Sequence, residues 1–262
     1  MSETALSAAF IRRFGETPKV PEGLAKIPAL NALATRGSCR SFTGQTVEPD
    51  VLETLSALAL CAPSKSDLQQ RDILIVTDPK LLAALKSLLD AQAWIAEAPA
   101  MVVFLANNRR QRQMQMMHDQ PFPNDHLDAF FNASVDAGIA LAFFMAAAEA
   151  AGLGCCPIST IRNHLPQVKD LLALPDHVFP VAGMAVGYPS AAPGVSARLP
   201  LSNTVHRDRF SDITEADIKS YDTRRLDGQN GPGWSEAKAK MYAAPQRTDF
   251  AAFLRSIGFT LE

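Results

Sequence analysis

The chain has 262 residues and a mass of 28.3 kDa, 47% of its residues are hydrophobic, and its formal net charge at pH 7 is −2. That length is enough for one large domain or two small ones, and the composition is that of an ordinary globular protein. Because 25 Lys and Arg are balanced by 27 Asp and Glu, no overall field attracts the chain to nucleic acid or to an anionic membrane. Any anion-binding site must therefore be local.

The chain contains four cysteines, Cys39, Cys61, Cys155 and Cys156. They have neither CxxC spacing nor the density of a disulfide scaffold, which predicts reduced thiols in a reducing compartment. Near the N-terminus, Arg12 and Arg13 follow the first apolar run, which reverses the order of a signal peptide. We therefore expect a cytoplasmic protein.

The first strong elements in chain order lie between residues 49 and 88. An apolar-periodic stretch that opens with Pro49 predicts a helix over about 49–61, because proline suits the first helical turn. The β-branched run 71–77 then predicts a strand. Asp78 and Pro79 follow as a capping pair and predict a second helix over the apolar residues after them.

The middle of the chain predicts a strand, an excursion and a long helix. Residues 100–106 are apolar and indicate a strand, whereas 107–125 have little hydrophobic periodicity and indicate a surface excursion. Residues 126–151 have a helical pattern that is apolar almost all round, typical of a helix buried in a core or at a subunit interface, and Gly152 is a natural stop. Its most apolar window, 137–148, is shorter than the roughly 18 residues that span a bilayer.

After that helix we predict a strand at 155–160, a helix capped by Asn163, and a strand at 178–188. This alternation of helices and strands favours an α/β or α+β domain. Beyond Pro189 the chain is polar, with a loop at 227–235, and predicts an arm that wraps the domain or a partner subunit. The expected organisation is a domain over 1–210 and a C-terminal arm over 211–262.

Several familiar catalytic motifs are missing. The sequence has no GxGxxG after a strand, no GxxxxGK[ST], no HExxH and no GxSxG. Its five histidines are scattered without the spacing of metal ligands. We therefore expect neither a hydrolase nor a metalloenzyme, and we assign no catalytic side chain and no metal ligand.

Four polar stretches remain: RGSCR at 36–40, SKSDLQ at 64–69, PIST at 157–160 and ARLP at 197–200. Together they offer three arginines and many neutral donors, which suits one phosphate and a polar heterocycle. Taken singly each has a simpler explanation, since two arginines four residues apart are most often an exposed face. Their order along the chain favours the binding site.

That order, RGSCRSF, PSKSDLQ, an apolar helix ending in GLG, IRN, VAGMAVGYP and RLPLSNTVHRDRF, resembles the nitroreductase family over about residues 33–210. The resemblance is greatest to the NADPH-dependent oxygen-insensitive nitroreductase and flavin reductase branch. It implies an α+β fold with a central, mostly antiparallel sheet flanked by helices. It also implies an intertwined homodimer that binds FMN at the subunit interface.

The implied activity is ping-pong hydride transfer from NADPH or NADH through FMN to small acceptors such as nitroaromatics, quinones or free flavin. Other flavin chemistry on the same fold, such as reductive dehalogenation or flavin breakdown, stays open, as does a flavin-binding protein without turnover. The FMN-binding residues that the resemblance implies are Arg36, Gly37, Ser38, Arg40, Ser64, Ser66, Gln69, Gln92, Pro157, Ile158, Ser159, Thr160 and Arg198.

Two further features belong to this resemblance. Arg224 and Arg225, in a polar segment, suit the 2′-phosphate of NADPH, which an arginine-bearing mobile loop holds in that branch. The chain departs from its close relatives at Ser159 and Thr160, where they tend to have glycines, and at Ser196, where they have lysine. For Cys39 we expect a buried free thiol.

Overall fold

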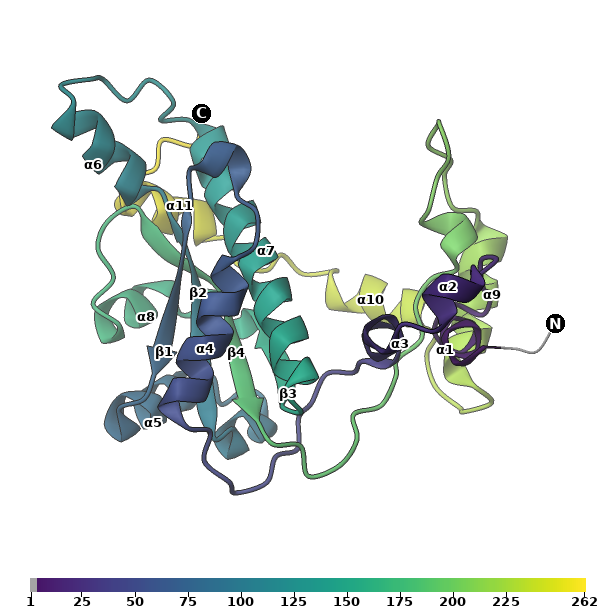
Figure 1. Cartoon of the computed structure of the whole chain (residues 1–262). Helices are drawn as coiled ribbons and strands as arrows, with labels where there is room; N and C mark the ends of the chain where they lie inside the picture. The colour runs from purple at the N-terminus through teal and green to yellow at the C-terminus, as the bar shows by residue number, and fades with distance from the viewer. Residues whose placement is uncertain (1–3) are drawn as a thin grey trace. The chain divides into compact units, whose positions relative to one another are not determined.

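The computed structural model describes residues 4–262, which divide into two compact units (Figure 1). The sheet unit comprises Ser38–Pro193 and Arg247–Glu262. The helical unit comprises the chain up to Gly37 together with Gly194–Gln246. The predicted division at residue 210 differs from this one, because 211–246 and 247–262 fall in different units.

The sheet has four strands, β1 (Arg71–Val76), β2 (Ala100–Asn107), β3 (Gly154–Ile158) and β4 (Val178–Gly187). Their order is β1-β2-β4-β3, and every neighbouring pair is antiparallel. A parallel α/β sheet, which the sequence had left open, is thereby excluded. The α+β fold with an antiparallel sheet is confirmed.

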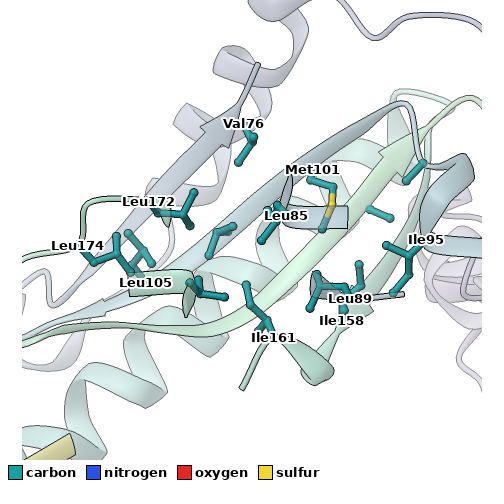
Figure 2. Close-up of a cluster of buried hydrophobic side chains, with 14 of the residues drawn as sticks. Val76, Leu85, Leu89, Ile95, Met101, Leu105, Ile158, Ile161, Leu172 and Leu174 are labelled. Atoms are coloured by element: carbon teal, nitrogen blue, oxygen red, sulfur yellow. The ribbon is translucent and has the colours of Figure 1, made fainter. Parts of the chain in front are cut away.

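Both faces of the sheet are covered by helices, as alternate residues of β2 show. Met101 and Val103 point into a cluster with Leu85 of α5 (Pro79–Leu88) and Val168 of α8 (Leu165–Leu171), shown in Figure 2. Val102 and Phe104 point into a second cluster, formed with α4 (Pro49–Leu60) and α7 (Leu127–Ala150). Because side chains alternate along a strand, a continuous apolar run such as β2 must be buried on both faces.

The residues predicted to begin and end these helices do so in the structure. Pro49 opens α4, and the Asp78 carboxylate accepts from the Leu81 N–H at 2.8 Å at the start of α5. Gly152 follows α7 with φ of 82°, in the left-handed region that glycine adopts without steric cost. The predictions for 49–61, 71–77, 100–106, 126–151 and 178–188 are confirmed to within a few residues.

Two local predictions are wrong, and the strand predicted at 155–160 ends two residues early. The excursion at 107–125 contains a helix, α6 (Arg109–Met117), built from Arg, Gln and Met, which are good helix formers even without an apolar face. Strand β3 ends at Ile158, and Ser159–Asn163 form a 3₁₀ turn. Asn163 does not cap α8, because its Oδ1 accepts from Arg247 Nε at 2.8 Å.

Helix α7 is long and apolar enough to cross a membrane by length and composition, with a mean hydropathy of 1.6 over its best 18 residues. The core helix of a soluble protein passes the same test. Here Ala140, Phe144 and Ala148 are buried against the sheet, whereas Phe131 and Phe143 are 59% and 46% exposed. The helix therefore has one apolar face in the core and another that residues 4–262 leave exposed.

The polar tail beyond Pro189 is more structured than predicted, since it contains α9 (Glu215–Leu226), α10 (Trp234–Met241) and α11 (Phe250–Ser256). Helix α11 inserts Phe253 and Leu254 into an apolar cluster of the sheet unit. Buried apolar side chains thus tie the end of the tail to the sheet unit.

The helical unit combines the tail's other helices with three N-terminal ones, α1 (Ala5–Phe14), α2 (Glu22–Ala25) and α3 (Pro28–Thr35) (Figure 1). Leu6, Ala9 and Ala34 form its small apolar core. Tyr221 of α9 is buried and packs edge-on against Trp234 of α10, with ring centroids 5.3 Å apart. No N-terminal helix was predicted from the sequence.

Candidate cofactor site

A cavity of about 680 Å³ in the helical unit is lined by Arg13, Arg36, Arg198 and Arg225. Arg36 ends α3, and Arg198 lies far along the chain, after the last strand. The fold thus brings together two of the three arginines that the resemblance assigns to a phosphate. The third, Arg40, belongs to the sheet unit.

The arginines of this cavity are held mainly by backbone carbonyls. Arg198 donates through Nη1 to the Ser196 hydroxyl at 2.7 Å, so Ser196 orients this guanidinium. Arg225 donates to the Ala197 carbonyl and to the Tyr221 hydroxyl, both at 3.0 Å. Guanidinium groups fixed in this way lose little conformational entropy when an anion binds.

The charge of the cavity is uniformly positive among the residues that are described as lining it, which include four arginines and no carboxylate. Phe14, Tyr221 and Trp234 supply aromatic walls. Planar guanidinium forks bind phosphate oxygens in pairs, and aromatic faces accept a flat heterocycle. This donor set therefore fits a phosphate ester that carries an aromatic ring system.

Arg224 lies in a helix, whereas the resemblance implies a mobile loop at this point. It lies in the last turn of α9 and donates to the carbonyls of Arg13, at 3.3 Å, and of Arg198. Its side chain passes directly over Gly15, where an added Cβ would come within 2.8 Å of Cδ. Arg224 is thus committed to the backbone, and Arg225 is the one that lines the cavity.

In the sheet unit, the segment 64–69 has a strained backbone. Ser66, Asp67 and Gln69 have φ of 50°, 55° and 52°, a region that non-glycine residues rarely adopt. The Ser64 hydroxyl accepts from the Gln69 N–H at 3.1 Å and closes the turn. The side chains of Ser66 and Gln69 are exposed. Strain of this kind persists only where the surroundings enforce it.

Asp136 enforces that conformation. This carboxylate of α7 is fully buried, and its two oxygens accept from the N–H groups of Lys65 and Gln70, each at 3.0 Å. The sequence analysis did not select Asp136. A signal was present, because a carboxylate in the apolar middle of a helix is costly to bury unless it is hydrogen-bonded.

Helix α6 supports the same segment from its other side. Gln111 donates to the Leu68 carbonyl at 2.5 Å, and Arg110 donates to the Gln69 carbonyl. The predicted surface excursion thus holds a candidate site segment in place.

Arg40 and Gln92, both predicted to contact FMN, meet at Trp94. The Arg40 guanidinium lies 5.9 Å from the centre of the Trp94 ring, and Gln92 accepts from the indole N–H at 2.9 Å. Both Arg40 and Gln92 are exposed. They are therefore close enough to serve one ligand, and their polar groups are accessible.

Gly37 and Ser38 lie on either side of the boundary between the two units. The next residue, Cys39, is 2% exposed, and its N–H donates to the Cys155 carbonyl at 2.9 Å. A Cβ at Gly154 would lie 2.5 Å from the Cys39 sulfur, so Cys39 fills the space that this glycine leaves. The expected buried free thiol is confirmed.

The predicted ring-lining stretch 157–160 combines accessible and buried groups. Pro157 and Ser159 are exposed, whereas Ile158 is buried in the core. Thr160 has a buried hydroxyl that no hydrogen-bond partner satisfies within residues 4–262. Because buried polar groups are nearly always paired, this orphaned hydroxyl is consistent with a bound group that completes the site.

The comparisons with known proteins identify the family. Residues 33–188 match the model of the nitroreductase family, and 196–262 match the model of its C-terminal domain. An "FMN reductase [NAD(P)H]" of Bacillus subtilis is 30% identical over 244 residues, or 89% of this chain and 98% of the relative. An "oxygen-insensitive NADPH nitroreductase" of Salmonella typhimurium is 32% identical over 198 residues, or 74% of this chain and 80% of the relative.

Two solved structures show the same fold. The structure of B. megaterium NfrA2 has a TM-score of 0.85 and 32% identity, over 90% of this chain and 99% of that one. An NADPH:FMN oxidoreductase from Vibrio harveyi, solved with NAD⁺, has a TM-score of 0.80 and 28% identity, over 88% and 98%. The chain therefore belongs to the nitroreductase family.

Proposed function

We propose that the protein is an FMN-dependent oxidoreductase that uses NADPH or NADH to reduce small acceptors such as nitroaromatics, quinones or free flavin. The observation that carries this proposal is the cavity shared by Arg36 and Arg198, since the fold brings two of the predicted phosphate ligands to one place. The names of the relatives, FMN reductase and NADPH nitroreductase, support the same reaction class.

In this proposal Arg36, Arg40 and Arg198 hold the FMN phosphate. The ribityl chain and ring lie against Gly37, Ser38, Ser64, Ser66, Gln69, Gln92 and residues 157–160. FMN would supply the group that accepts hydride from a nicotinamide and passes it to the second substrate. The chain's own contribution is to fix the cofactor and to keep the polar groups of Ser66, Gln69 and Ser159 at exposed positions.

The nicotinamide donor is proposed to bind through Arg225. This guanidinium lines the arginine cavity and carries charge suited to the 2′-phosphate that distinguishes NADPH from NADH. Arg224 would act with it only indirectly, because its own donors are used by backbone carbonyls.

We further propose a homodimer with FMN at the subunit interface. Support comes from the exposed apolar face of α7, where Phe131, Val135 and Phe143 are 59%, 40% and 46% exposed. Contiguous exposed apolar side chains of this kind mark protein interfaces. A cytoplasmic location is proposed because four free cysteines persist as thiols in a reducing compartment.

The test of this function begins with the purified protein. It should be yellow, acid-released cofactor should have the mass of FMN, and NADPH oxidation should proceed with menadione or nitrofurazone. Arg225→Ala should raise KM for NADPH and leave KM for NADH unchanged. A colourless protein that binds no added FMN would refute the proposal, and bound FMN without turnover would favour a flavin carrier. Turnover of only a halogenated substrate, or breakdown of free flavin in place of its reduction, would indicate the other flavin chemistries.

A further inference from the structure

The first helix of the chain lies outside the region that matches the family. The two family models begin at residues 33 and 196, yet α1 (Ala5–Phe14) belongs to the same unit as Arg36 and Arg198. What α1 contributes is therefore described by neither family model.

Arg13, near the end of α1, joins the two segments that carry the cavity's arginines. It is only 7% exposed. Its guanidinium donates to the carbonyls of Ala34 at 2.9 Å and Arg36 at 2.5 Å, and to that of Ser196 at 3.4 Å. One buried side chain thus holds the end of α3 and the segment before Arg198 at the same time.

The backbone that follows Arg13 adds contacts to the second segment. The Arg13 carbonyl accepts from the Arg198 N–H at 2.7 Å and from Arg224 Nη1 at 3.3 Å. The Glu16 carboxylate accepts from the Ser202 N–H at 2.7 Å. Gly15, with φ of 77°, allows the chain to turn between these contacts.

We propose that Arg13 is a positioning residue for the phosphate site, which holds Arg36 and Arg198 at the spacing that one phosphate requires. The inference rests on the proposed binding of FMN. Arg13 acts through the two backbone segments, because its guanidinium donates to their carbonyls. A guanidinium suits this task better than an ammonium, because its five donors are spread over a rigid planar fork and can reach three separate carbonyls.

The variants Arg13→Met and Arg13→Lys separate shape from charge. Methionine fills a similar volume but leaves three carbonyls without their donor, and lysine keeps the charge but not the fork. Arg12→Met is the matched control, since Arg12 is exposed on the same turn of α1. Each apoprotein is titrated with FMN and with riboflavin, which lacks the phosphate, and flavin fluorescence gives both dissociation constants.

We expect Arg13→Met to weaken FMN binding by about tenfold or more and riboflavin binding by less than about twofold. Arg13→Lys should give an intermediate ratio, and Arg12→Met should behave as the wild type. The ratio of the two constants is decisive, because a general loss of structure would weaken both flavins alike.

An unchanged ratio in both Arg13 variants would overturn the inference while leaving the proposed function intact. If Arg13→Met does not fold, Arg13→Lys alone decides. A preference for FMN over riboflavin equal to that of the wild type overturns the inference, and a smaller preference supports it. A wild-type protein that binds both flavins equally, or neither, would instead refute the phosphate site itself, and the inference with it.

Discussion

At the scale of single residues, the candidate site depends on buried polar groups that bind backbone. Asp136 holds the strained segment 64–69, and Arg13 holds the segments that carry Arg36 and Arg198. Both are charged groups with less than a tenth of their surface exposed. Burying a charged side chain costs free energy unless the group is hydrogen-bonded. Asp136 and Arg13 therefore favour the backbone conformations in which their hydrogen bonds form.

Replacing Asp136 by asparagine tests the first of these roles. An amide can accept from only one of the two N–H groups and turns a donor toward the other, so the free energy of unfolding should fall by about 1–3 kcal/mol. Urea denaturation measures this loss, and hydrogen exchange should accelerate at Lys65 and Gln70. Asp128→Asn, at an exposed position of α7, is the control. Unchanged exchange at both amides would contradict the role of Asp136.

At the scale of elements, the sequence predicted what local chemistry determines. Pro49 and Asp78 mark helix starts through their own backbone and side chain, and the apolar run of β2 is long enough to identify a strand. Helix α6 was missed because its Arg- and Gln-rich sequence lacks an apolar stripe. The role of Arg13 was missed because its partner Ser196 lies 183 positions away, and no local pattern reports such a contact.

The sequence predicted part of the site as well, namely the residues that belong to local motifs. The ordered motifs selected Arg36 and Arg198, which line one cavity, and Arg40 and Gln92, which meet at Trp94. Asp136 and Gln111, which support the segment between Ser64 and Gln69, were not selected because their partners are backbone groups. A family motif records the residues that face a ligand more readily than those that hold them.

The packing of the residues that follow α11 against the rest of the sheet unit should depend on pH through His177. Burial, and next the charge of Arg112, lower the pKa of this imidazole below its ordinary value, although its Nε2–H donates to the Gly258 carbonyl at 3.1 Å, a contact that acts in the opposite direction. The unfolded chain therefore takes up the proton at a higher pH than the folded chain does. Stability is thus unaffected well above about pH 6.5 and falls as the pH drops below that value.

His177→Asn should lose less stability than the wild type between about pH 7 and pH 5, because the group that resists protonation is gone. Thermal unfolding of both proteins across this range measures the difference. His118→Asn, at an exposed position, serves as the control. Parallel pH profiles for the wild type and His177→Asn would contradict this account.

At the scale of the whole molecule, the exposed half of α7 is the feature that a single chain does not explain. Phe131, Val135 and Phe143 are exposed on a helix whose opposite side packs into the core. Burying apolar surface gains about 25 cal/mol per Å², so large exposed side chains on a rigid helix favour association. A second copy of the chain is the partner that accounts for them in the proposed homodimer.

Replacing both Phe131 and Phe143 by glutamate should therefore convert a dimer into a monomer, because charged groups would have to be buried without partners in the interface. Light scattering after size-exclusion chromatography measures the mass. Met116→Glu, at a position of α6 that is 76% exposed, should leave the dimer intact. Since FMN is proposed to bind between subunits, the monomeric variant should also lose FMN while keeping the far-UV circular dichroism of the wild type. A wild-type protein of monomeric mass, or a double variant that stays dimeric and yellow, would show that α7 is not the interface.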